Sequence, residues 1–318
     1  MKRLADLIDG FQRAEGPPPQ QLGAFFRWCL QGAWGPLWVA AFVSAAAGTL
    51  EVVTALLLGA VIDGAIDAGP GAFFSQEQGL LLGFFLFFVV LRPMVFGLSA
   101  GANAIVVQPN VTPLVLSRLH RWTMGQAVDF FDNDFAGRIS QKQMQAARAV
   151  TDITVETINV VAFALASLIG SALLLTTIDG RIALALAIWL VAYFAVIGWF
   201  LPRIRKRSAA RAGARTMVTG QVVDTITNIK TVKLFGHADH EDEAALGAMR
   251  TFRERALDFG VLATGFRFVL MLVAGLLPVV LIGGTLLLWR DGQASPGDIA
   301  AAGAIALRIA QMTGWVSF

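Results

Sequence analysis

Residues 182–201 read IALALAIWLVAYFAVIGWFL, twenty consecutive residues without a charged side chain. As a helix, this stretch is about 30 Å long, which matches the hydrocarbon core of a bilayer. It is followed at once by PRIRKRSAARAGAR at 202–215, which carries six basic residues. Because basic segments next to a span remain on the cytosolic side, the pattern predicts a membrane-spanning helix whose C-terminal end faces the cytosol.

The composition of the whole chain agrees with a membrane protein. Of its 318 residues 56% are hydrophobic and 15% are charged, and the mean hydropathy is +0.65. A soluble domain would need more charge to cover its surface. An unpaired backbone amide is costly in hydrocarbon, so each apolar stretch should be a helix, and the period-two alternation of a barrel is absent. We predict an all-α polytopic protein with six spans: about 34–62, 78–107, 157–178, 182–201, 258–289 and 297–318.

The distribution of basic residues predicts the orientation. The connectors 63–77, 179–181 and 290–296 hold only Arg181 and Arg290, whereas 108–156 holds five basic residues and 202–257 holds eleven. The N-terminal segment 1–33 holds four and should be cytoplasmic, because positive loops stay inside. Within it, the aromatic residues around Arg27 suggest a short helix in the headgroup layer, with a solvated tail as the alternative. We expect a multi-pass protein of a cell membrane, such as a bacterial inner membrane.

The two long cytoplasmic connectors read as helices that extend the spans beyond the bilayer. Few helix breakers separate them from the apolar stretches, and 25 additional residues would project about 35–40 Å. Such projections need a partner at their tips.

Three segments resemble the transmembrane domain of an ABC transporter of the six-helix exporter type. They are FFDNDFAGRIS at 130–140, ITNIKTVKLFGHADHE at 226–241 and GGTLLLWRDGQASPGDIAAAGA at 283–304. Each is weakly specific alone, but their order on six spans is a strong signal. The resemblance covers nearly the whole chain, so residues 34–318 are expected to form one such domain.

The resemblance implies that the tips of both long loops form coupling helices, which dock on ATP-binding domains. The residues it assigns to this contact are Phe130, Phe131, Asp132, Phe135, Gly137 and Arg138 in the first loop, and Gln221, Asp224, Thr225 and Asn228 in the second. Aromatic side chains supply a large buried area in a small contact. The alternative is that Phe130 and Phe131 cap a helix hairpin against lipid headgroups.

The family's phosphate-binding motif G-x-x-x-x-G-K-[ST] does not occur in this sequence, so ATP and Mg²⁺ would bind to the implied ATP-binding domain. No cofactor and no catalytic residue is expected in this chain. The resemblance also implies a second transmembrane half, identical or homologous, and no nucleic acid. The family continues the sixth helix beyond the position of Phe318 into a nucleotide-binding domain, so we expect a piece of a fused transporter rather than a separately encoded permease.

Four charged residues lie within the predicted spans, where charges are costly and usually face a cavity or a partner. Glu51, Arg92, Arg267 and Arg308 are therefore the candidates for a translocation pathway. Alternatively, Glu51 pairs with Arg92 or Arg308 as a structural or gating ion pair. The G-x-x-x-G spacing of Gly79 with Gly83, and of Gly97 with Gly101, suggests helix packing within the chain or, less directly, a dimer face.

Other chemistry is weakly supported. His237 and His240, with the acids that follow them, could bind a cation, but a solvated charge run explains them equally well, and no metal site is expected. The sequence thus favours the membrane part of an ATP-driven exporter that moves a hydrophobic or amphipathic substrate by alternating access. The alternatives are a motor-independent secondary transporter or channel, and an anchor for a cytosolic partner.

Overall fold

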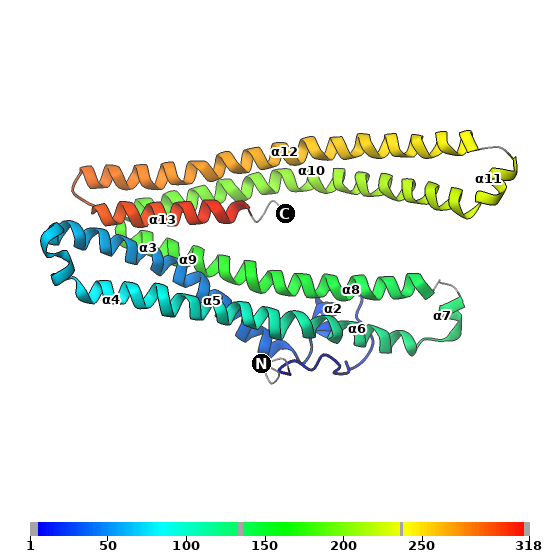
Figure 1. Ribbon diagram of the computed structural model, residues 1–318, viewed down its shortest axis with the longest axis horizontal. Coiled ribbons are helices and arrows are strands. Elements are labelled where there is room, and N and C mark those ends of the chain that lie inside the picture. Colours follow the sequence, from blue (N-terminus) through cyan, green and yellow to red (C-terminus); the bar gives the residue numbers. More distant parts are fainter. Residues whose placement is uncertain (1–5, 133–135, 236–237, 315–318) are drawn as a thin grey trace. The chain divides into compact units, whose positions relative to one another are not determined.

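The computed structural model describes residues 6–132, 136–235 and 238–314, and all regular structure in these residues is helical (Figure 1). The N-terminal part contains α2 (Leu22–Cys29), α3 (Trp34–Gln76), α4 (Gln78–Leu86), η1 (Phe87–Leu91), α5 (Arg92–Gly101), η2 (Ala102–Val107), α6 (Gln108–Met124), α7 (Val128–Asp132), α8 (Ala136–Glu156), η3 (Thr157–Ala162) and α9 (Phe163–Ile178). The remainder contains α10 (Gly180–Thr227), α11 (Ile229–Phe235), α12 (Ala238–Arg290) and α13 (Pro296–Thr313).

Five helical segments are long and apolar enough to cross a membrane. They cover Trp34–Gln76, Gln78–Met124, Gly137–Ile178, Gly180–Thr227 and Asp242–Arg290, and each has 42 to 49 residues. A span needs about 20 residues, so every one of them is much longer than the hydrocarbon core requires. Helix α13 is not one of the five. The predicted all-helical membrane fold is therefore confirmed, with five candidate spans among the described residues.

Among the described residues, three short π-helical segments, η1, η2 and η3, interrupt these long helices. The segment η1 stands directly before Arg92 and Pro93, and the ring of Pro93 removes one backbone donor, which favours a local widening of the turn. In α3 the helix is broken at Gly69, whose φ is 69°, just before Pro70. A positive φ of this kind suits glycine, since a Cβ atom would be strained there.

The chain divides into two compact units, of which the first comprises residues 1–178 and 288–305. Its centre is the contact of α3 with α9, where small residues allow a close approach. A Cβ atom at Gly48 would lie 2.3 Å from the carbonyl oxygen of Phe163, and one at Gly170 would lie 3.0 Å from Cγ2 of Val52. Small residues let helix backbones pack closely where apolar burial between helices gives no advantage.

The glycines that the sequence suggested for helix packing within the chain do not serve that role. A Cβ atom built at Gly79, Gly83, Gly97 or Gly101 has no atom of the described structure within 4 Å. The prediction of close packing within the chain at these positions is wrong, because the spacing is common in apolar sequence and does not identify which helix face meets a neighbour. Their alternative role at a dimer face stays a prediction.

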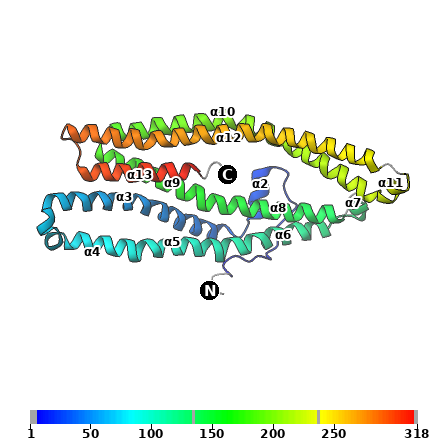
Figure 2. The same ribbon diagram turned by 45° about the horizontal axis from the view of Figure 1, so that its top comes forward.

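The second unit comprises residues 179–287 and 306–318, and its main elements are α10 and α12, which run antiparallel side by side (Figures 1 and 2). The indole Nε1 of Trp189 donates to the carbonyl oxygen of Val273 at 2.6 Å. Further along, the rings of Phe200 and Phe266 lie 5.1 Å apart. These contacts join the two helices over several turns.

Candidate functional site

The first loop tip is a short helix that presents aromatic side chains to solvent. Helix α7 follows a turn at Gly125 and Gln126 and carries Phe130 and Phe131, which are 43% and 38% exposed. Their rings meet edge to face at 5.3 Å. Two adjacent phenylalanines that remain this exposed outside the apolar stretches are unusual unless another surface covers them.

The other residues predicted for this loop flank α7. Gly137 and Arg138 are exposed in the first turn of α8. Phe135 lies outside the described residues, and of Asp132 only the backbone, at the end of α7, is described. The structure thus brings Phe130 and Phe131 onto one short helix and places Gly137 and Arg138 at the start of the next.

The second loop tip has a similar build. Gln221, Asp224 and Thr225 lie in the last turns of α10, and Asn228 is the residue that ends it. The side-chain Nδ2 of Asn228 donates to Oδ1 of Asp224 at 3.0 Å, and its backbone N–H donates to the Asp224 carbonyl. These four residues therefore stand at the end of the long helix, and the short helix at the tip is α11, which follows them and exposes Leu234 at 81%.

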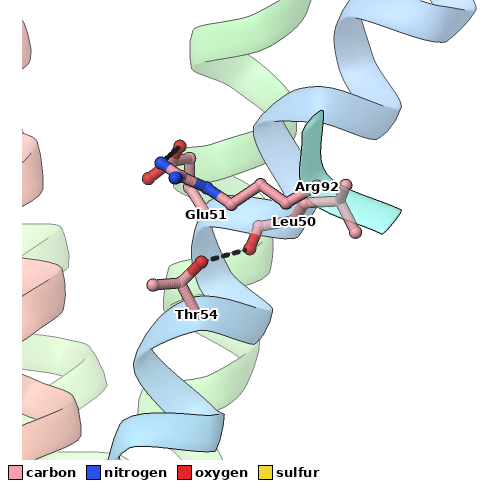
Figure 3. Close-up of polar contacts among 4 residues, drawn as sticks. All are labelled: Leu50, Glu51, Thr54 and Arg92. Carbon is pink, nitrogen blue, oxygen red and sulfur yellow. Dashed lines mark hydrogen bonds and ion pairs between the residues drawn. The ribbon is translucent and has the colours of Figure 1, made fainter. Parts of the chain in front are cut away.

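Glu51 and Arg92 form an ion pair between α3 and α5. The Nη2 atom of Arg92 lies 3.0 Å from Oε1 of Glu51, and Figure 3 shows the two side chains reaching toward each other beside the Thr54–Leu50 hydrogen bond. The Glu51 side chain is 7% exposed and the Arg92 side chain 37%. The guanidinium carbon also lies 5.2 Å from the centre of the Phe96 ring and 6.0 Å from that of Phe88.

This geometry suits charges inside a membrane protein. A carboxylate and a guanidinium that neutralise each other, with aromatic rings around the cation, are cheaper to bury than either charge alone. Of the two pairings that the sequence left open for Glu51, the structure shows the one with Arg92.

The other two charged candidates lie in the second unit. Arg267 is exposed on α12 and lines a cavity of about 560 Å³, together with Leu270, Met271 and Pro278 and the last turns of α13 around Gln311. Arg308 is half-buried on α13. The cavity is mostly apolar with an arginine and a glutamine at its wall, which suits an amphipathic ligand.

Arg118 is the most deeply engaged charged residue described, and the sequence offered it only as one of several cytoplasmic basic residues. It is 2% exposed, and it donates to four backbone carbonyl groups. Its Nε reaches Gln12 at 3.1 Å, Nη1 reaches Trp28 at 2.7 Å and Cys29 at 3.0 Å, and Nη2 reaches Gln31 at 2.8 Å. The planar guanidinium group satisfies several acceptors in a fixed fork, so it fastens residues 12–31 to α6.

This attachment also buries Cys29. The thiol is 0% exposed, and burial raises its pKa to about 12, although the nearby Arg118 guanidinium opposes the shift. Around it, Trp28, Leu30, Val111 and Leu114 belong to one apolar cluster that joins α2, α3, α6 and α8. Arg118 stands in the basic stretch SRLHR at 117–121, and nothing in that stretch distinguishes it from the neighbouring Arg121.

A second unexpected contact joins Asp63 of α3 to the start of α13. Asp63 accepts from the Ser295 hydroxyl group at 2.6 Å and from the Gly297 backbone N–H at 2.7 Å. Asp298 accepts from the Ser295 backbone N–H at 2.8 Å, and its own N–H donates to the Ser295 hydroxyl oxygen at 3.0 Å. The carboxylates thus satisfy the free donors at the helix N-terminus.

The histidines give no support for a metal centre. His237 lies outside the described residues and the side chain of His240 is not described. Within the described part of the chain, no three His, Cys, Asp or Glu residues gather in a way that could hold a metal ion.

Together, the long apolar helices and the two hairpins with short helices at their tips define a multi-pass helical membrane protein. Residues 37–312 match the ABC transporter transmembrane region family. The match covers most of the chain, so the protein belongs to this family. This confirms the resemblance drawn from the loop segments.

A curated relative from Haemophilus influenzae is named an uncharacterized ABC transporter ATP-binding protein. It is 28% identical over 307 residues, which make up 94% of this chain and 48% of the relative. The chain therefore spans about half the length of the curated relative that it matches.

Proposed function

We propose that the chain is the membrane-spanning part of an ATP-driven exporter, which moves a hydrophobic or amphipathic substrate by alternating access. The observation that carries the proposal is the pair of loop tips, α7 and α11, each a short helix with exposed apolar side chains at the end of a long helical hairpin. A motor-independent transporter or channel would leave both tips without a partner.

In this proposal α13 is the sixth span, and both tips lie in the cytosol with the N-terminus, as the basic residues of 108–156 and 202–257 favour. The membrane is a cell membrane such as a bacterial inner membrane. The tips contact ATP-binding domains, fused or separate, that bind ATP and Mg²⁺, and a second copy or a homologous half completes the pathway. The name of the Haemophilus relative, in which an ATP-binding protein contains a region similar to this chain, supports such a pairing.

Within the first tip, Phe130 and Phe131 would supply the buried contact, because aromatic residues at the centre of an interface contribute most of its energy. At the second tip, Asp224 and Asn228 at the end of α10 would set the direction of α11. Helix α11 would then make the docking contact. Glu51, Arg92, Arg267 and Arg308 remain the proposed charged residues of the pathway.

The test is Phe131→Ala in the complete transporter, with its ATP-binding domains present. We expect transport to fall by about tenfold or more, while ATP hydrolysis persists without stimulation by substrate, since one buried aromatic contact is worth about 1.4 kcal/mol or more. The matched control is Met124→Ala, which changes a residue that is 67% exposed at the end of α6 but outside α7. Unchanged transport in Phe131→Ala would count against coupling through this tip and favour the motor-independent alternative.

A further inference from the structure

A hollow of about 420 Å³ lies between α10 and α12, one or two turns beyond the apolar stretch 182–201. Its wall is strongly basic, with Arg203, Lys206 and Arg207 from α10 and Arg255 from α12. The one acidic residue of the wall is Asp258, and Leu262 adds an apolar side chain on the side of the span. Residues far apart in sequence thus converge on one space.

The positive charge of this hollow is only partly compensated. Four cations and one carboxylate leave a net charge of +3. Arg255 lies 3.9 Å from the Asp258 carboxylate, but both side chains are more than half exposed, so the pair is weak. Arg207 donates from Nη1 to the Asp258 backbone carbonyl at 2.7 Å, which orients the guanidinium group without neutralising it.

The cations are also held in place by the helices. The guanidinium carbon of Arg203 lies 3.9 Å from the centre of the Trp199 ring, in the last turn of the apolar stretch, and the guanidinium donates to the Trp199 carbonyl oxygen. Trp199 is 55% exposed, as expected of an aromatic residue at a membrane interface. Arg203 and Arg207 are therefore fixed in direction before any ligand arrives.

The hollow lies at the depth of the lipid headgroups. Counted from Leu201, the last residue of the apolar stretch, Arg203 to Arg207 extend roughly 3 to 9 Å further along the helix axis. The headgroup layer on each side of the hydrocarbon core is roughly 5 to 8 Å thick. On α12, Arg255 lies just before the apolar stretch that begins near residue 258, so both walls reach the same layer.

We propose that this basic hollow binds the phosphate group of an anionic phospholipid of the cytoplasmic leaflet, with an acyl chain along Leu262. The cytosolic position of a loop explains why many basic residues follow a span. It does not explain why basic residues of two helices converge on one cavity. Basic pockets between membrane helices at this depth suit phosphate headgroups. The choice of leaflet rests on the orientation proposed above, whereas the phosphate chemistry does not.

The test uses the whole 318-residue chain in neutral detergent, titrated with phosphatidylglycerol and followed by native mass spectrometry. Phosphatidylcholine and inorganic phosphate form parallel titrations. The variant is Lys206→Gln with Arg207→Gln. The matched control is Arg205→Gln with Arg215→Gln, which removes the same charge from exposed positions of α10 outside the hollow. No ATP hydrolysis is needed, so the outcome is independent of the exporter proposal.

We expect the first variant to bind phosphatidylglycerol about 5- to 30-fold more weakly than the unchanged chain, since each basic residue near anionic lipid contributes about fivefold. The control should change less than about twofold. Lys206→Gln alone, which breaks none of the hydrogen bonds described here, should show about half of the effect on a logarithmic scale. Equal losses in variant and control, or binding of phosphatidylcholine or inorganic phosphate as tight as that of phosphatidylglycerol, would each overturn the lipid site.

Discussion

The Asp63 carboxylate and the Ser295 hydroxyl group, 232 positions apart in sequence, lie 2.6 Å from each other at the point where α3 meets the first turn of α13. The same carboxylate accepts the Gly297 backbone N–H. The two helices also approach each other closely at this point, since a Cβ atom at Gly59 would lie 2.7 Å from the Gly297 carbonyl oxygen. This approach depends on the absence of a side chain at position 297.

We predict that Gly297→Ala destabilises the protein by about 1–3 kcal/mol, the range for overpacking a tight contact. A Cβ atom there would lie 2.3 Å from Oδ2 of Asp63 and from the Gly59 carbonyl oxygen, so α3 and α13 must separate. Thermal unfolding in detergent measures the change. The control Gly283→Ala places a methyl group in open space within a helix and should leave stability unchanged or raise it by up to about 1 kcal/mol. Equal effects in both variants would contradict the argument.

Arg118→Met should be strongly destabilising, by about 3 kcal/mol or more, because it leaves four carbonyl groups without their donor. The visible result is rapid proteolysis within residues 12–31, which the guanidinium group holds against α6. Arg121→Gln is the matched control, since Arg121 is exposed and gives one hydrogen bond to the Phe11 carbonyl. Resistance to protease in the Arg118 variant would show that the apolar cluster alone holds this segment.

Cys29 should not react with maleimide at pH 8 in the folded protein and should react fully after unfolding. Burial raises the pKa of its thiol to about 12, above the ordinary value of about 8.5. Between about pH 8.5 and pH 12 the thiol of the folded protein keeps a proton that the thiol of the unfolded protein releases. This contribution to stability is therefore complete below about pH 8.5 and is lost as the pH rises toward 12, by up to about 1.4 kcal/mol per pH unit.

The matched variant Cys29→Ala removes the titrating group and should flatten this part of the pH dependence, at a constant cost for the lost volume. Labelling of the folded protein at the rate of a free thiol would contradict the buried position of Cys29.

For Glu51 and Arg92 we predict a positive coupling energy in a double-mutant cycle of unfolding. Glu51→Gln leaves a half-buried guanidinium without its carboxylate, whereas Glu51→Gln with Arg92→Gln removes both charges. The double variant should thus be less destabilised than the sum of the single ones, by about 1 kcal/mol or more.

Transport by the same variants separates the two roles of the pair. If the ion pair is structural, the double variant restores transport along with stability. If it belongs to the pathway, transport stays low in the double variant although the fold has recovered.

Much of the fold could be predicted from the sequence because a backbone in hydrocarbon must satisfy its own hydrogen bonds. An apolar stretch such as 182–201 can do so as a helix, and the loop segments made the family recognisable. The contacts between individual side chains were harder to predict. The pairing of Glu51 with Arg92 was one of two possibilities, since each residue stands alone in an apolar run and nothing in the sequence gives the register between two spans.

The contacts made by Arg118 and Asp63 were missed for a related reason. Arg118 binds only backbone carbonyl groups, and Asp63 binds a backbone N–H together with the hydroxyl group of a serine 232 positions away. A backbone group carries no residue type that a sequence could reveal, and nothing in the sequence pairs Asp63 with so distant a serine. The glycine pairs in 79–101 predicted a close helix contact that the described structure does not contain. Their spacing alone does not say which face of a helix is covered by a neighbour.

The pair α10 and α12 has a mechanical consequence. Hydrogen bonds from Trp189 and Arg207 join the two helices at separated levels, and α10 continues without interruption for 48 residues, or about 70 Å. Two rods linked in this way resist bending far better than one. A tilt of about 5° at the α11 end would therefore shift the opposite end by roughly 6 Å, so a small rotation applied to the tip becomes a displacement large enough to rearrange side chains at the far end.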